Sequence, residues 1–204
     1  MNRNENWGGY RVILASASPR RKELLNQIGI EPEIRPSHMA EETGERKPDR
    51  VVMELSRQKA EDIAAEYGAG TMVIGADTVV AVGSEILGKP GTPMKAYEMI
   101  EKLQGRTHQV YTGVTVLLCQ GGGMTHGITF AEKTDVHVYP MTPMEISEYA
   151  GCPEPLDKAG AYGIQGRFAA YIKGIDGDYA NVVGLPLGRL NQEIKGLLED
   201  REDD

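Results

Sequence analysis

Residues 71–82, Thr-Met-Val-Ile-Gly-Ala-Asp-Thr-Val-Val-Ala-Val, place one acidic side chain inside an otherwise apolar run. The many β-branched residues predict a buried β-strand. Asp77 lies inside this strand, where a carboxylate is costly to remove from water unless it pairs with a cation, a metal ion or a hydrogen-bond donor. Gly75 and Ala76 precede it and would let another group approach closely. The stretch therefore predicts a strand that carries a candidate functional acid.

Two interpretations of Asp77 are open from the residues alone. In the first it is a catalytic carboxylate, since acids in unusual environments gather at functional sites. In the second it is half of a structural ion pair. Lys89, in the turn Gly88-Lys89-Pro90, is a candidate partner for it.

Helices and strands are predicted to alternate on both sides of residues 71–82. The long adjacent strands in the middle of the chain indicate a mixed sheet, so we expect an α/β fold. The expected helices cover residues 19–27, 49–67, 92–103, 142 onward and 186–198, and the other expected strands cover 11–15, 108–119, 128–139 and a short stretch near 171.

Composition restricts the class of protein. A chain of 204 residues, with 40% hydrophobic and 25% charged residues, is typical of one globular domain, in one or two lobes. No apolar run reaches the roughly 18 residues of a membrane span. Only two cysteines are present, Cys119 and Cys152, so we expect reduced thiols and a cytoplasmic protein. The net charge of −8 disfavours polymeric nucleic acid as a partner but allows a small anion.

The segment Ser16-Ala17-Ser18-Pro19-Arg20-Arg21 joins the first strand to the first helix. Ser18 occupies the N-cap position and Pro19 the first helical position, so backbone N–H groups point out of this end. Arg20 and Arg21 are unfavourable in a first turn unless an anion binds there. The segment predicts a phosphate site, and a plain surface helix with solvated arginines is the alternative.

Lys59 lies on the apolar stripe of the helix over residues 49–67. Val52, Leu55 and Ile63 share that stripe because the spacings are three or four residues. One interpretation is an ammonium that faces a polar cleft. The other is a side chain whose stem packs while its charge reaches water.

The run Asp157-Lys158-Ala159-Gly160-Ala161-Tyr162-Gly163-Ile164-Gln165-Gly166 predicts a glycine-rich loop. Gln165 offers a donor and an acceptor, which suits the edge of a nucleobase. An ordinary connection is the alternative. Elsewhere, the four histidines lack metal-site spacing and no phosphate-loop or dinucleotide motif occurs. Glu41 and Glu42 could serve a metal ion or could be solvated.

Several of these motifs, in this order, resemble the Maf nucleotide pyrophosphatases. The matching segments are Leu14 to Arg21, Lys59-Ala60, Gly75-Ala76-Asp77-Thr78, Gly88-Lys89-Pro90, Gly105-Arg106-Thr107-His108, Asp157 to Gly166, Gly177-Asp178-Tyr179 and Val183 to Leu187. Together they extend over nearly the whole chain, which makes the resemblance specific.

The resemblance implies a Maf/HAM1 (ITPase-like) fold, with a mixed twisted sheet, flanking helices and two lobes around a substrate cleft. We expect residues 1–10 to form a flexible tail, residues 11–198 a single Maf-like domain of two lobes, and residues 199–204 an acidic tail. The resemblance also implies a homodimer.

The resemblance further implies hydrolysis of a nucleoside triphosphate to the monophosphate and pyrophosphate. Asp77 would be the general base, with Mg²⁺ or Mn²⁺ nearby, and Glu41 or Glu42 would be the additional acid. The triphosphate would contact a polar ring made of Ser16, Arg20, Arg21, Lys59 and Lys89.

Three positions imply the branch of the family that acts on dTTP and UTP. They are Arg20, Thr78 and Gln165, where the branch acting on 7-methyl-GTP tends to carry tryptophan, glutamine and glutamate. House-cleaning of nucleotide pools is one physiological role consistent with such an enzyme. The alternatives are a pyrophosphatase of the 7-methyl-GTP type and a nucleotide-sensing protein that regulates septum formation.

Overall fold

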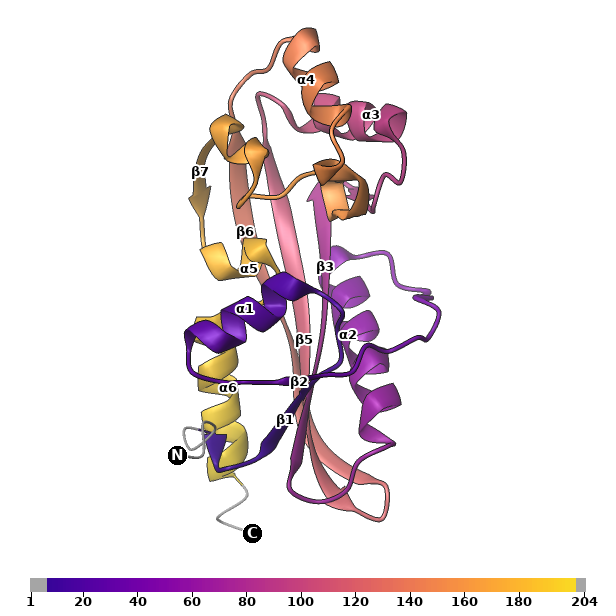
Figure 1. Cartoon of the computed structure of the whole chain (residues 1–204), viewed down its shortest axis with the longest axis vertical. Coiled ribbons are helices and arrows are strands. Elements are labelled where there is room, and N and C mark those ends of the chain that lie inside the picture. Colours follow the sequence, from indigo (N-terminus) through magenta and orange to yellow (C-terminus); the bar gives the residue numbers. More distant parts are fainter. Residues whose placement is uncertain (1–6, 201–204) are drawn as a thin grey trace. The chain divides into compact units, whose positions relative to one another are not determined.

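The structure, a computed structural model, describes residues 7–200. Its sheet has seven strands in the order β2-β1-β3-β5-β6-β7, with β4 paired to β3 (Figure 1). The strands are β1 (Arg11–Leu14), β2 (Glu33–Ile34), β3 (Thr71–Val82), β4 (Glu85–Leu87), β5 (Thr107–Gly121), β6 (Met124–Val138) and β7 (Ile172–Asp176). β1 runs parallel to β2 and β3, whereas β4 and β7 pair antiparallel with their neighbours. The predicted α/β fold with a mixed sheet and flanking helices is confirmed.

The helices follow the predicted order. They are α1 (Pro19–Gln27), α2 (Pro48–Ala64), α3 (Pro93–Leu103), α4 (Pro143–Ala150), α5 (Tyr179–Val183) and α6 (Leu187–Glu199). The predicted glycine-rich loop contains a short 3-10 helix, η3 (Ala159–Ala161). Two further 3-10 helices flank it, η2 (Glu154–Asp157) before and η4 (Arg167–Tyr171) after. The sequence did not predict β2, β4 or α5, each of which is too short for a periodic pattern. Among the described residues no helix is both long and apolar enough to cross a membrane.

The chain divides into two compact units. Unit 1 comprises Met1–Asp77, Thr112–Glu132 and Gly184–Asp204, and unit 2 comprises Thr78–Tyr111 and Lys133–Val183. Strands β3, β5 and β6 contribute residues to both units. The expected cleft between two lobes stays a prediction.

Trp7, the first described residue of the segment 1–10 that is expected to form a tail, contacts α6. Trp7 is 1% exposed, and its Nε1 donates a hydrogen bond to Asn191 Oδ1 of α6 at 3.1 Å. The flexibility expected for residues 1–10 stays a prediction. Residues 1–6 of that tail, and residues 201–204 of the predicted acidic tail, lie outside the described residues.

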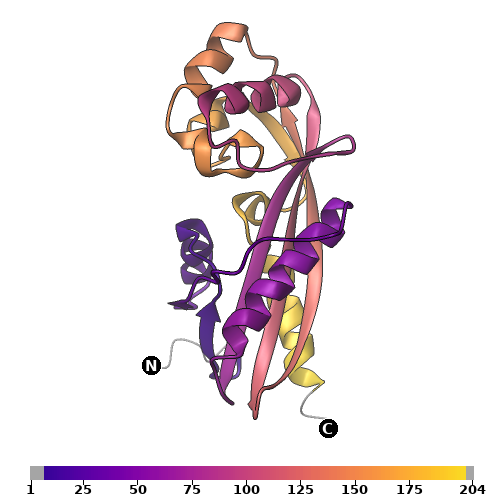
Figure 2. The ribbon, with the colours of Figure 1, turned by 90° about the vertical axis from the view of Figure 1, so that its right-hand side faces the viewer.

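In unit 1, helix α2 packs directly on the backbone of the sheet. A Cβ atom added to Gly75 of β3 would lie 2.3 Å from the Ser56 carbonyl oxygen, and one added to Gly113 of β5 would lie 2.2 Å from the Val52 carbonyl oxygen. The Ser56 and Thr115 hydroxyls also share a hydrogen bond of 3.0 Å across this contact. Figure 2 shows α2 running along β3. The two glycines therefore set how closely α2 approaches the sheet.

In unit 2, the core includes an aromatic cluster around Phe168, which is fully buried. Its ring centroid lies 5.0 Å from that of Tyr149, 4.8 Å from Tyr162 and 5.7 Å from Tyr171. Tyr149 belongs to α4, whereas Tyr162 belongs to the glycine-rich segment. The cluster thus packs that segment against a helix.

We expect Gly75→Ala to lower the free energy of unfolding by about 2 kcal/mol or more, because the new methyl group overlaps the backbone of α2. Denaturant unfolding monitored by circular dichroism measures this change. Gly196→Ala is the matched control, since that helical glycine has no atom near its would-be Cβ and should gain about 1 kcal/mol. Equal effects of the two substitutions would contradict the close packing.

Candidate active site

An ammonium and two carboxylates meet in unit 1. Lys59 Nζ lies 2.6 Å from Asp77 Oδ1 and 2.6 Å from Glu41 Oε1. The Lys59 and Asp77 side chains are 16% and 11% exposed, whereas that of Glu41 is 50% exposed. Two carboxylates therefore share one largely buried cation, and Glu41 forms the side of the cluster that is open to water.

The packing of α2 on β3 explains why Lys59 reaches Asp77. Successive strand residues point to opposite faces, so Gly75 and Asp77 face the same side of β3. Ser56 and Ala60 contact Gly75, and Lys59 extends from the same turn of α2 toward the next position on that face. The ammonium therefore faces inward, and the alternative in which it reaches water past the apolar stripe is wrong. The observed ion pair of Asp77 is with Lys59, not with Lys89.

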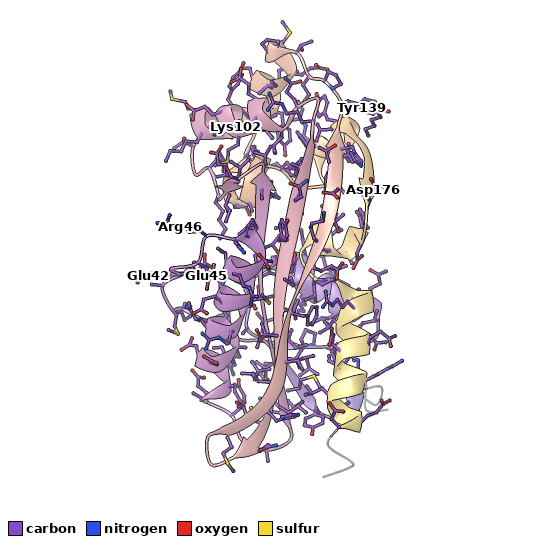
Figure 3. All side chains as sticks on the ribbon, turned by 180° about the vertical axis from the view of Figure 1, so that it is seen from behind. Glu42, Glu45, Arg46, Lys102, Tyr139 and Asp176 are labelled. Carbon is purple, nitrogen blue, oxygen red and sulfur yellow. The ribbon has the colours of Figure 1, made fainter. Side chains whose placement is uncertain are left out.

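The structure separates Glu41 from Glu42, which the sequence could not do. Only the Glu41 carboxylate contacts Lys59, whereas Glu42 uses its carbonyl oxygen to accept a hydrogen bond from Gln58 Nε2 at 3.1 Å. Figure 3 shows Glu42 on the loop before α2, with its side chain directed away from that helix. Glu41 is therefore the acid that belongs to the cluster.

Arg21 is fixed by the Gly184 backbone before α6 and by the Ser16 side chain before α1. Its Nε donates to the Gly184 carbonyl oxygen at 2.8 Å, and its Nη1 donates to Ser16 Oγ at 2.9 Å. Ser16 Oγ also accepts from the Ser18 backbone N–H at 3.3 Å. Ser18 occupies the predicted N-cap position, but its own hydroxyl makes no capping hydrogen bond. The predicted phosphate-binding turn is thus organised by Ser16 and Arg21.

The charges of this turn and of the acidic cluster affect one another. Burial lowers the pKa of the Arg21 guanidinium, the Asp77 carboxylate opposes this change, and the Arg20 guanidinium adds to it. Arg20 is partly exposed in the first turn of α1. Two guanidiniums, one ammonium and two carboxylates therefore form one electrostatic group in unit 1.

The other predicted binding residues lie in unit 2. Thr78 is partly buried on β3, and Lys89 and Gln165 are exposed. The Gly160 N–H donates to the Gly88 carbonyl oxygen at 3.1 Å, which ties the turn that carries Lys89 to the glycine-rich segment. Gly160, with φ +66°, also packs against Val80, two residues beyond Thr78 on the same face of β3. Thr78 therefore faces the side of β3 that the segment bearing Gln165 covers.

The comparison with protein families agrees with these motifs. The model of the Maf-like protein family matches residues 11–197. The chain belongs to the Maf family. It is 50% identical to a dTTP/UTP pyrophosphatase of Lachnoclostridium phytofermentans over 91% of this chain and 94% of that protein. Proteins with the same name from Agathobacter rectalis (53%; 92% of this chain, 97% of that one) and Carboxydothermus hydrogenoformans (47%; 91% and 97%) are similar.

Among solved structures, a nucleoside-triphosphatase / dITP/XTP pyrophosphatase from Mycobacterium abscessus shows a distant likeness. The TM-score is 0.38 and the sequence identity 10%, over 64% of this chain and 75% of that one. A likeness of this size carries no argument about the site. The Maf family assignment rests on the sequence matches.

The sequence did not single out three residues of this Maf chain that contact predicted site residues or the segments that carry them. The Gly184 carbonyl oxygen accepts the Arg21 hydrogen bond. In unit 2, the Tyr149 hydroxyl accepts a hydrogen bond from the Gly163 N–H, and the Glu154 carboxylate lies against Gly166. Glu154 lies three residues before the glycine-rich segment in the sequence. An acid at that position that was only solvated would give the same sequence pattern. Only the tertiary contacts separate the two cases.

A buried histidine also anchors the glycine-rich segment. His108 Nε2 lies 2.7 Å from the Tyr162 hydroxyl, and both rings are buried. Burial lowers the pKa of His108 to about 4, a change to which His137 contributes and which Asp135 opposes. His108 is therefore neutral at pH 7, and the same burial raises the pKa of Tyr162.

We expect His108 to make unfolding depend on pH. Its pKa of about 4 lies below the ordinary 6.5, so the unfolded chain binds this proton first and stability falls as pH drops from about 6.5 to 4. The loss from this residue is roughly 3 kcal/mol. His108→Gln should remove that part of the pH dependence in urea titrations, whereas substitution of the exposed His126 by Gln should not. Parallel pH curves for wild type and His108→Gln would disprove the assignment.

Proposed function

We propose that this Maf protein hydrolyses dTTP and UTP to the corresponding monophosphate and pyrophosphate. The observation that carries the proposal is the cluster of Asp77, Lys59 and Glu41 beside the two arginines of α1. In this cluster, a carboxylate that can accept a proton from water lies next to cations that can bind a triphosphate. Relatives 46–53% identical to this chain, over at least 91% of it, are named dTTP/UTP pyrophosphatase, which supports the substrate.

In the proposed reaction, Asp77 accepts a proton from a water molecule as the water oxygen forms a bond to the α-phosphorus. The bond from the α-phosphorus to the oxygen that bridges to the β-phosphorus breaks, and pyrophosphate leaves with that oxygen. Phosphoryl chemistry of this kind depends on in-line positioning and charge stabilisation, without a covalent intermediate. Lys59 orients the Asp77 carboxylate by its hydrogen bond of 2.6 Å.

Within unit 1, the proposed triphosphate contacts are made at the start of α1. Arg20, Arg21 and the backbone N–H groups at the start of α1 form one anion-binding surface, which Ser16 organises. A role for Lys89 as a further triphosphate-binding cation stays a prediction. Thr78 and Gln165 are proposed to contact the base, where the Gln165 amide supplies both a donor and an acceptor.

A divalent cation fits the donor set of this site. Asp77 and Glu41 lie within 2.6 Å of one ammonium nitrogen, so both carboxylates can reach a single small cation. Mg²⁺ is usually bound by one or two carboxylates together with substrate phosphates and waters. Asp77 and Glu41 are the residues that would bind it. Bound Mg²⁺ or Mn²⁺ supplies charge neutralisation of the phosphates and a lower pKa for coordinated water.

Other features implied by the resemblance stay predictions. They are the homodimer, the cytoplasmic location and the role in nucleotide pools or septum formation. A pyrophosphatase of the 7-methyl-GTP type and a nucleotide-sensing protein are outcomes that the first experiment below distinguishes.

Asp77→Asn should reduce turnover of dTTP and UTP by at least about 100-fold, because the amide cannot accept the proton. Pyrophosphate release is measured for wild type and variant with dTTP, UTP, CTP, GTP and 7-methyl-GTP in Mg²⁺ or Mn²⁺. Thermal unfolding checks that the variant is folded. Turnover of 7-methyl-GTP alone would show that the enzyme is of the 7-methyl-GTP type. Binding of the nucleotides without turnover would favour the nucleotide-sensing protein. An active Asp77→Asn variant would show that Asp77 is not the general base.

Glu41→Gln and Glu42→Gln form a matched pair, since the two acids are adjacent in one exposed loop. Glu41→Gln should lower kcat and weaken the dependence of the rate on metal concentration, because the charge beside Lys59 is lost. Glu42→Gln should behave like wild type. Metal titrations of the initial rate measure both, and equal behaviour of the two variants would contradict a role for Glu41.

A further inference from the structure

Gln165 lies in a tight turn whose two ends are bonded to each other. The Gly166 N–H donates to the Gly163 carbonyl oxygen at 3.1 Å, so Ile164 and Gln165 are the central residues of the turn. Gln165 is exposed at this point. The orientation of its amide therefore depends on how firmly the turn is fixed to the rest of unit 2.

Two acceptor atoms outside the turn fix its two ends. The Tyr149 hydroxyl oxygen accepts a hydrogen bond from the Gly163 N–H, and Glu154 Oε2 accepts one from the Arg167 N–H at 2.9 Å. The Tyr149 hydroxyl in turn donates to Glu154 Oε1 at 3.0 Å. The backbone on both sides of Gln165 is thus attached to one linked pair of side chains, which we call the Tyr149–Glu154 clamp.

The clamp is closely packed. A Cβ atom added to Gly166 would lie 2.2 Å from Glu154 Oε1, so the carboxylate rests against the turn where only glycine leaves room. Lys158 Nζ donates to the Glu154 carbonyl oxygen at 2.7 Å, which fixes the backbone of η2. Tyr149 is 3% exposed, and its ring packs on Phe168 in the core of unit 2.

We propose that Tyr149 and Glu154 are positioning residues for base selection: by fixing the turn at Gly163–Gly166 they limit the orientations of the Gln165 amide and thereby set the preference for UTP over CTP. The proposal rests on the proposed function. It concerns two residues that touch neither the phosphates nor the reacting water in that function, and that act only through Gln165.

The chemistry of the two bases explains why a fixed turn matters. Uracil presents a carbonyl acceptor and an N–H donor on its pairing edge, whereas cytosine presents an amino donor and a ring-nitrogen acceptor. A glutamine amide carries both functions, and a flip of the amide exchanges them. The flip is a rotation within the side chain, so the clamp acts on the position from which that side chain starts. A fixed start limits which atoms of the base edge the amide can reach, and this limit favours one base over the other.

The test compares kcat/KM for UTP and CTP in wild type, Tyr149→Phe and Glu154→Ala. Tyr149→Phe retains the ring in the aromatic cluster and removes only the hydroxyl, so the fold should persist. We expect the ratio of kcat/KM for UTP to kcat/KM for CTP to fall by about tenfold in each variant, which is the size of one lost hydrogen bond. The fall should come mainly from a higher kcat/KM for CTP, and kcat for UTP should change little. Tyr139→Phe and Glu148→Gln, at exposed positions of the same unit, are matched controls and should keep the wild-type ratio.

A second comparison separates positioning from general stability. If the clamp acts through Gln165, adding Tyr149→Phe to Gln165→Ala should change the ratio no further, because the coupled residue is already gone. Hydrogen exchange of the Gly163 and Arg167 amides should accelerate in Tyr149→Phe and Glu154→Ala respectively. Unchanged ratios in both single variants, or fully additive effects in the double variant, would overturn the proposal.

Failure of the proposed function gives a different pattern. Wild-type protein that hydrolyses neither UTP nor CTP would disprove the pyrophosphatase function, and the ratio of equilibrium binding constants for the same two nucleotides would then test the clamp. Faster amide exchange with an unchanged preference would show that the clamp is structural and that Gln165 does not select the base.

Discussion

The contact between α2 and β3 at Gly75 is the constraint on which the site in unit 1 depends. A helix normally stands off a sheet by the length of the side chains between them. Here Gly75 and Gly113 remove those side chains, so the backbone of α2 lies against the strands. Lys59 can then extend along the strand to Asp77, two residues beyond Gly75. The ion pair is therefore a consequence of glycine placement as much as of charge.

This packing also determines the electrostatics of the charged cluster around Asp77. Lys59 neutralises only part of the charge of Asp77 and Glu41, and Arg21 of α1 interacts electrostatically with the same two carboxylates. A protein with a net charge of −8 thereby gathers Lys59, Arg21 and the neighbouring Arg20 into one region of unit 1. The local arrangement, and not the average composition, suits a polyanionic substrate.

In unit 2, the glycine-rich segment that carries the exposed Gln165 is fixed by contacts with neighbouring elements. The glycine-rich segment has few large side chains that could pack against one another. Residues of neighbouring elements therefore hold it in place. His108 contacts Tyr162 at one point, and the Tyr149–Glu154 clamp bonds the turn that carries Gln165. Glycines in this segment serve close approach, as Gly166 does against Glu154, and one left-handed position, Gly160.

The sequence by itself determined the order of the long elements and most of the candidate site. Strand 71–82, helix 19–27 and the apolar stripe around Lys59 were predictable because periodicity and capping are local signals. Short elements such as β2 and α5 were not, since two to five residues carry no period. Tertiary structure alone decided that Lys59 pairs with Asp77, that Glu41 rather than Glu42 joins them, and that Tyr149 and Glu154 fix the turn at Gln165. Each of these facts depends on groups distant in sequence or on the direction of one side chain, and local patterns do not encode such contacts.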